Sequence, residues 1–96
     1  MNSWLRDIDR ATTGTELVAH TKDYFALVNP RDLAGLPEEM RTIRIERETD
    51  IPLWKEKLAR GCAGLQPEAY EGERVREMLS YLSKAADRLD EIRSVQ

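Results

Sequence analysis

The sequence predicts an all-α fold: a single small bundle of about four main helices plus short helical turns, with a long amphipathic C-terminal helix. Apolar residues recur at three- and four-residue spacings, the pattern of a helix with one buried face. Proline, glycine and capping residues divide the chain into segments of helical length. Hydrophobic residues make up 41% and charged residues 34%, a balance typical of a soluble, helix-rich domain. No long linker or internal repeat interrupts residues 1–96, so one domain is expected.

A first helix of about two and a half turns is predicted after Ser3, which suits the N-cap position. The apolar residues that would face the core are Trp4, Leu5, Ile8 and Ala11. A second helix is predicted to begin near Gly14, because residues 13–16 match a capping box. In that motif the Thr13 hydroxyl accepts a hydrogen bond from the Glu16 N–H, and the Glu16 carboxylate reaches back to the helix start.

The second helix is expected to stop at Asn29-Pro30, because the residue before a proline is disfavoured in the helical conformation. Its buried face would comprise Leu17, Thr21, Tyr24, Phe25 and Val28. Asn29 would then cap a short new turn that starts at Pro30 and is limited by a glycine and a proline a few residues later. Leu33 and Leu36 are expected to close this end of the core.

The segment between the second and third helices is harder to interpret. Pro37-Glu38-Glu39 is typical of a helix start, because acidic residues suit the positive end of the helix dipole. From Thr42 to Glu48, apolar and charged residues alternate as in a strand, yet no other segment of the chain could pair with it. We therefore expect residues 42–48 to form an extended connector or a frayed helix.

A third helix is predicted to start at Thr49 as the cap, with Pro52 in the first turn, where its missing N–H is tolerated. Its inward stripe would be Ile51, Trp54 and Leu58. Gly61 is expected to end this helix in a left-handed conformation, with residues 61–64 forming a turn.

The C-terminal helix carries the clearest pattern, a stripe made of Val75, Met78, Leu82, Ala85, Leu89 and Ile92. The pattern extends from Pro67 to about Ser94, but acidic residues and Gly72 interrupt its first turns, so the helix is predicted to begin near Glu73. It would be about 33 Å long, or about 42 Å if it started at Pro67. A compact chain of this size is about 32 Å across. The helix is therefore predicted to span its own domain. Its stripe would either close this bundle or join two copies as a homodimer.

Charge and cysteine content limit the classes of function. The net charge of −3 and the pI of about 5.2 provide no general attraction to nucleic acids or anionic lipids. The N-terminal residues show no signal peptide, and the longest apolar run, residues 25–28, is too short to span a membrane. The single cysteine, Cys62, cannot form an internal disulfide, so a cytoplasmic location is expected.

The most suggestive group of metal-ligating residues is Glu16, His20 and Asp23, which are spaced i, i+4 and i+7 on one helix face. His20 is the only histidine, and no second Glu-x-x-His motif completes a site, so a solvated polar face is the favoured interpretation. Cys62 stands between glycines without a nearby base and is interpreted as an unreactive thiol. We therefore expect no catalytic residues, no metal and no cofactor.

Three arginines offer a local site for nucleic acid. Arg41, Arg44 and Arg47 are three residues apart and would form one ridge on a helix, with Lys55 and Lys57 able to join it. Glutamates interleave with these arginines and no aromatic residue is placed for base stacking, so solvation and local ion pairing are the favoured roles.

Together these patterns favour a small cytoplasmic interaction module, such as an adaptor, regulatory subunit or partner-binding protein, that works through helix surfaces. The expected partner-binding residues are those of the C-terminal stripe. The alternative functions are a nucleic-acid-associated regulator that uses the arginine ridge and, less favoured, a metal-binding helical bundle.

Overall fold

The computed structural model describes residues 3–66, 68 and 70–95, and within them the chain forms helices and no strand. The four main helices are α1 (Ser3–Arg10), α2 (Gly14–Ala26), α3 (Asp50–Ala63) and α4 (Tyr70–Val95), and the two short 3₁₀ helices are η1 (Pro30–Leu33) and η2 (Glu38–Met40). The predicted all-α bundle is confirmed. None of the described helices is both long and apolar enough to cross a membrane.

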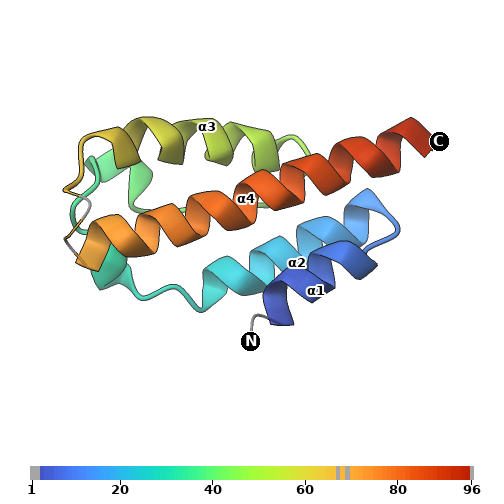
Figure 1. The fold of residues 1–96 in the computed structure, drawn as a ribbon, viewed down its shortest axis with the longest axis horizontal. Coiled ribbons are helices and arrows are strands. Elements are labelled where there is room, and N and C mark those ends of the chain that lie inside the picture. Colours follow the sequence, from blue (N-terminus) through green and yellow to red (C-terminus); the bar gives the residue numbers. More distant parts are fainter. Residues whose placement is uncertain (1–2, 67, 69, 96) are drawn as a thin grey trace.

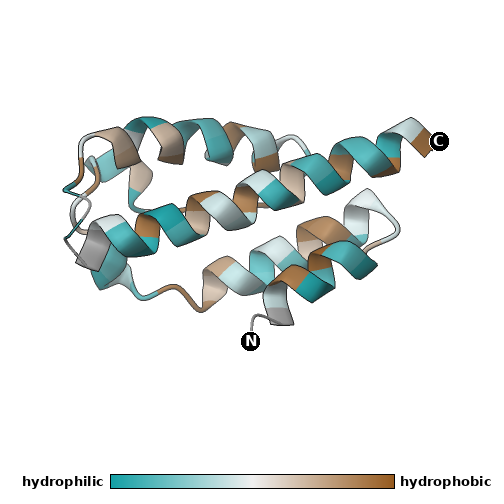
Figure 2. Cartoon of the chain, viewed as in Figure 1, coloured by the Kyte–Doolittle hydropathy of each residue, from teal (hydrophilic) through white to brown (hydrophobic). Residues whose placement is uncertain are grey.

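Helix α4 is the central element of the bundle. Figure 1 shows it between α3 on one side and α1 with α2 on the other, and it packs against all three helices and η1. Its 26 residues extend about 39 Å at 1.5 Å per residue, close to the 40 Å length of the whole molecule. Apolar residues recur between polar ones along this length (Figure 2). The prediction that this helix spans its own domain is therefore confirmed.

The core is built from the predicted apolar faces. Its members from the first three helices, and from the residue that follows α1, include Ile8, Ala11, Leu17, Ile51, Trp54 and Leu58, and all are buried. Leu33 and Leu36 close one end of the core, as expected. Of the predicted face of α2, Leu17 and Thr21 are fully buried, whereas Tyr24, Phe25 and Val28 are half-buried.

The N-terminal end of α2 has the predicted cap with one difference. The Glu16 N–H donates to the Thr13 hydroxyl at 3.1 Å, as the capping box requires. The Glu16 carboxylate reaches back one residue further than expected and accepts from the N–H and hydroxyl of Thr12, at 3.0 and 3.2 Å. Helix α2 ends at Ala26, slightly before the predicted Asn29, whose side chain caps η1 by accepting from the Arg31 N–H at 3.0 Å.

Residues 41–49 contain no helix, so the connector is the correct one of the two predicted alternatives. Exposure alternates along it: Ile43 is half-buried and Ile45 is buried, whereas the residues beside them are exposed. In Figure 1 this connector runs behind α4 to the start of α3. It thereby places the two isoleucines against the core.

Helix α3 begins where predicted, but Thr49 does not cap it. Thr49 already has helical dihedral angles and its side chain caps nothing. The Asp50 carboxylate instead accepts from the N–H groups of Glu46 and Arg47, at 2.9 and 3.0 Å. These N–H groups precede α3, so Asp50 does not cap the helix but attaches the connector to its first residue.

The predicted end of α3 at Gly61 is wrong. The helix continues to Ala63, and no described glycine has a positive φ. Gly61 is small for a packing reason: a Cβ there would lie 2.7 Å from Leu36 Cδ2 and 3.0 Å from Met40 Sδ. The predicted turn at residues 61–64 is therefore mostly helix, and Cys62 is buried within it.

Helix α4 begins at Tyr70, three residues before the start near Glu73 that the sequence pattern predicts. Gly72, which weakens the helix pattern, is buried there because its Cα faces the backbone carbonyl of Gln66. The gain from this close packing outweighs the low helix propensity of glycine. The alternative start at Pro67 lies outside the described residues.

The hydrogen bonds that Asp50 accepts from the connector predict acid sensitivity. The hydrogen bond from the Glu46 N–H lowers the pKa of Asp50, against the opposing effect of burial. Because the folded-state pKa lies below the unfolded value of about 3.9, this stabilisation is complete above about pH 4 and is lost as the pH falls through the folded-state pKa. We expect Asp50→Asn to flatten the decrease in unfolding free energy between about pH 5 and pH 2.5, measured by urea denaturation. The exposed Asp23→Asn is the control, and an equal slope in both variants would show that the hydrogen bonds to Asp50 do not stabilise the fold.

Adding a methyl group at Gly72 or at Gly64, which flank the segment between α3 and α4, is predicted to change the unfolding free energy by different amounts. Gly72→Ala should lower the unfolding free energy by about 1–3 kcal/mol, because the Cβ would overlap the Gln66 carbonyl oxygen. Gly64→Ala should leave the unfolding free energy within about 0.5 kcal/mol of wild type. The added Cβ would lie 3.8 Å from its nearest neighbour, the Gly61 carbonyl oxygen, and the φ of −91° suits alanine. Equal melting temperatures for the two variants would show that the Gln66 carbonyl does not constrain Gly72.

Candidate functional site

The predicted partner-binding stripe lies inside the bundle. Each of its members is at most 6% exposed: Val75, Met78, Leu82, Ala85, Leu89 and Ile92. The stripe is covered by helices of its own chain, so of the two predicted arrangements the structure has the one that closes the bundle. A partner could reach these residues only if the bundle opened.

The three arginines proposed as a ridge do not form one, because the connector that carries them is not helical. The Arg41 Nε donates to the Leu36 carbonyl at 2.8 Å, and Arg47 Nη2 lies 3.7 Å from Asp50 Oδ1. Lys57, which was expected to join them, has its Nζ 4.6 Å from the centre of the Trp54 ring. The geometry therefore offers no continuous row of cations for a phosphate backbone.

Glu16, His20 and Asp23 do not assemble as a metal site. The Glu16 carboxylate is bonded to Thr12, and the described residues contain no group of three possible ligands close enough to hold an ion. Cys62 is only 6% exposed and lies in the core.

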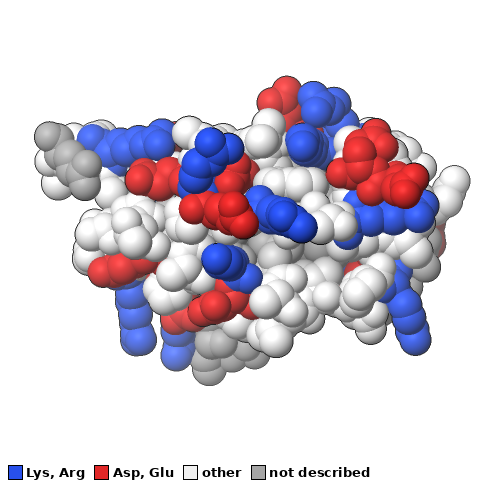
Figure 3. Space-filling view, turned by 180° about the vertical axis from the view of Figure 1, so that it is seen from behind, with Lys and Arg blue, Asp and Glu red and all other residues white. Residues whose placement is uncertain are grey.

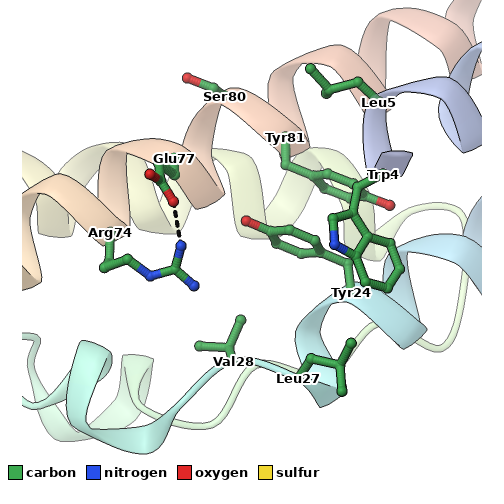
Figure 4. Close-up of a pocket in the computed structure, with 9 residues that line it drawn as sticks. All are labelled: Trp4, Leu5, Tyr24, Leu27, Val28, Arg74, Glu77, Ser80 and Tyr81. Carbon is green, nitrogen blue, oxygen red and sulfur yellow. Dashed lines mark hydrogen bonds and ion pairs between the residues drawn. The ribbon is translucent and has the colours of Figure 1, made fainter. Parts of the chain in front are cut away.

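The candidate site is a cavity of about 490 Å³ where α1, α2 and α4 meet, shown in Figure 4. Its lining residues come from α1, from the end of α2 and from one face of α4, and are Trp4, Leu5, Tyr24, Leu27, Val28, Arg74, Glu77, Ser80 and Tyr81. This volume suits a small molecule or one or two side chains of a partner.

One wall of the cavity is an aromatic platform. The rings of Tyr24 and Tyr81 are stacked, with centroids 4.0 Å apart and planes only 5° from parallel. Trp4 and Phe25 meet Tyr24 edge-on, at centroid distances of 5.6 and 5.0 Å. Such edge-to-face and stacked contacts fix the orientation of the rings. The platform is therefore a rigid apolar surface formed by three helices.

The opposite wall of the cavity carries the guanidinium of Arg74, which two carboxylates hold in place. Asp32 on η1 is only 2% exposed, and its Oδ2 accepts from Arg74 Nε at 3.2 Å. Glu77, one helical turn along α4, accepts from Arg74 Nη1. Burial lowers the pKa of Arg74, but the hydrogen bonds and charges of Asp32 and Glu77 outweigh it and raise the pKa. Arg74 is thus permanently charged and fixed in place, although 29% of its side chain remains exposed.

Two hydrogen-bond donors face the cavity from these walls. Figure 4 shows the second terminal nitrogen of Arg74 directed towards Val28 and the Tyr24 hydroxyl on the Arg74 side of the platform. Burial is the main cause that raises the pKa of Tyr24, so this hydroxyl keeps its proton at neutral pH. The site therefore presents donors beside an apolar surface.

The net charge of this wall is close to −1, because two carboxylates surround one guanidinium. Repulsion from Asp32 and Glu77 opposes an anionic ligand, whereas a neutral acceptor such as an amide carbonyl meets no such penalty. The cavity-lining residues include no imidazole and no thiol. The arrangement thus suits binding of a neutral group with an apolar body.

Sequence reasoning missed Leu27 and all the residues that α4 contributes to this site, among them Tyr81 and Arg74. Tyr81 is only 2% exposed, and its position between Met78 and Ala85 at helical spacing was a usable signal that it belongs to the buried face. The ion pair of Arg74 with Asp32 joins residues 42 positions apart, so no local spacing could indicate it.

Comparison with known proteins adds no assignment. The chain matches no protein family model, no curated protein and no solved structure.

The buried Tyr81 hydroxyl gives a direct test of this packing. It has no partner within hydrogen-bonding geometry among the described residues. Burial is the main cause that raises the pKa of Tyr81 to about 12, against a smaller lowering by the nearby Thr21 hydroxyl. Tyr81→Phe should therefore leave the unfolding free energy unchanged at pH 7 or raise it by up to about 1 kcal/mol. A raised pKa also means that wild-type stability falls as the pH rises from about 10 to 12, a loss that the variant should reduce. Urea unfolding of wild type and variant at pH 7 and between about pH 10 and 12 checks both expectations. A Tyr81→Phe variant that is less stable than wild type at pH 7 would show that the hydroxyl is hydrogen-bonded.

Proposed function

We propose that the protein is a small helical interaction module that binds a neutral polypeptide segment at the cavity between α1, α2 and α4. An apolar or aromatic side chain of the partner would lie against the half-buried Tyr24, whose ring is supported by the buried Tyr81, while a backbone carbonyl accepts from Arg74 and the Tyr24 hydroxyl. The observation that carries the proposal is a fixed guanidinium beside a rigid aromatic surface.

The rim of the cavity supports this proposal. Leu27 is 71% exposed, the most exposed large apolar residue that lines the cavity, and Trp4 and Leu5 beside it are half-buried. Tryptophan, tyrosine and arginine are the residues most enriched among strong contributors to protein interfaces. The exposed Leu27 on the rim favours a partner that covers this leucine together with the tryptophan, tyrosine and arginine of the cavity.

Two finer points belong to the same proposal. The protein would act in the cytoplasm, which is supported by the single, buried and unpaired Cys62. A homodimer through the α4 stripe is not favoured, since those side chains are already buried in the bundle. Nucleic-acid binding is not carried forward, because Arg41 and Arg47 are engaged within the chain.

The test is titration of the ¹⁵N-labelled protein with N-acetyl-tryptophanamide, followed by NMR chemical shifts. We expect the amides of Leu27, Arg74 and Ser80 to shift at ligand concentrations on the order of a millimolar, as for a small ligand with few contacts. The anionic analogue N-acetyl-tryptophan should bind about two- to tenfold more weakly, because of the two nearby carboxylates.

Two variants separate the contributions in the same titration. Tyr24→Phe should weaken binding about two- to tenfold through the loss of one hydrogen bond. Leu53→Ala, at an exposed leucine of α3, should leave it unchanged. Shifts outside the cavity, or tighter binding of the anionic analogue, would refute the proposal.

A further inference from the structure

The backbone of the connector between η2 and α3 has a run of unpaired polar groups. No N–H or C=O of residues 42–45 makes a hydrogen bond with any other described residue. The run has sharp limits: the Arg41 N–H donates to the Glu38 carbonyl, and the Glu46 and Arg47 N–H groups donate to Asp50. Thr42 and Arg44 are exposed and Ile43 is half-buried, so the unpaired groups of residues 42–44 can reach water, whereas Ile45 is buried.

The same four residues have the side-chain pattern of a sheet edge. Thr42 and Arg44 are exposed, whereas Ile43 is half-buried and Ile45 is 2% exposed. Side chains that alternate in this way place the backbone polar groups to the sides of the segment, where a second strand could pair with them. The connector therefore resembles a short edge strand without a sheet.

A shallow channel follows this edge on the side of α2. Two hollows of about 220 and 180 Å³ lie one after the other, and both are lined by Phe25 of α2 and Ile43 of the connector. The connector runs behind α4 in Figure 1 and therefore on the face drawn in Figure 3, where charges of both signs are separated by uncharged surface. Of the residues that line the channel, only Val28 also lines the cavity.

The charged residues of the channel are mostly basic. Lys22 and Arg44 line one hollow and Arg41 lines the other, against a single acid, Glu46. The rim thus has two more positive than negative charges and complements an acidic partner.

We propose that this channel binds an extended acidic peptide segment, which adds as a strand to the backbone of residues 42–44. Main-chain hydrogen bonds supply the pairing, and Lys22 and Arg44 face the acidic side chains of the peptide. A second copy of the chain is a poorer occupant, because it would bring the same basic rim against itself, which is repulsive.

The experiment uses the ¹⁵N-labelled wild-type protein and a short blocked peptide that alternates glutamate and valine. At saturation we expect hydrogen exchange of the residue 42–44 amides that face the peptide to slow about tenfold. A matched peptide in which alternate backbone amides are N-methylated should bind about tenfold more weakly, since it lacks donors for the pairing. These two measurements need no variant and so do not depend on mutant folding.

Charge is tested separately. Arg44→Glu should weaken the glutamate peptide about three- to tenfold and strengthen a lysine–valine peptide, whereas the exposed Arg6→Glu on α1 should change neither. Binding of the glutamate peptide without protection of these amides, or equal binding of the N-methylated peptide, would overturn the strand-addition proposal. Tighter binding of a thymidine oligonucleotide at the same residues would overturn it in favour of a nucleic-acid partner. Because the channel and the cavity share no charged residue, failure here leaves the cavity proposal untouched.

Discussion

Burial of the apolar stripe of α4 is the interaction on which the other elements depend. Helices α1 and α2 lie on one side of it and α3 on the other, so α4 joins both parts of the core. Each large apolar side chain in such a stripe contributes about 1.5–3 kcal/mol, whereas a whole domain is stable by only about 5–15 kcal/mol. The stripe therefore cannot be exposed to a partner without unfolding the bundle, and recognition has to use the outer surfaces of the helices.

Two arginines near opposite ends of α4 attach the irregular parts of the chain to this helix. Arg74 binds the buried carboxylate of Asp32 and so fixes η1. Arg88 donates through Nε and Nη2 to the carbonyl of Ala11, at 3.1 and 2.8 Å, and so fixes the turn between α1 and α2. Both arginines also pair with a glutamate three residues further along α4. The shape of the cavity thus follows from the same contact that holds η1 in place.

The features that could be predicted from the sequence are those set by neighbours along the chain. Spacing identified the buried faces of the helices, and the Thr13 and Asn29 caps follow from residues within one turn. The end of α3 and the start of α4 depend on contacts of Gly61 with Leu36 and of Gly72 with Gln66, which propensity does not contain. The cavity needed both kinds of information: the buried side of Tyr24 was predictable, but its stacking on Tyr81 and the Arg74–Asp32 pair exist only after α4 docks.

The order of the helices along the chain has a consequence for biosynthesis. Helices α1, α2 and α3 leave the ribosome before α4, the helix against which all of them pack. Until α4 emerges, the apolar faces of the nascent chain have no native surface to cover them, and exposed apolar surface of this kind promotes aggregation. Folding of this bundle consequently waits until α4 has emerged, and chaperones that shield nascent apolar segments have longer to act on α1 and α2 than on α3.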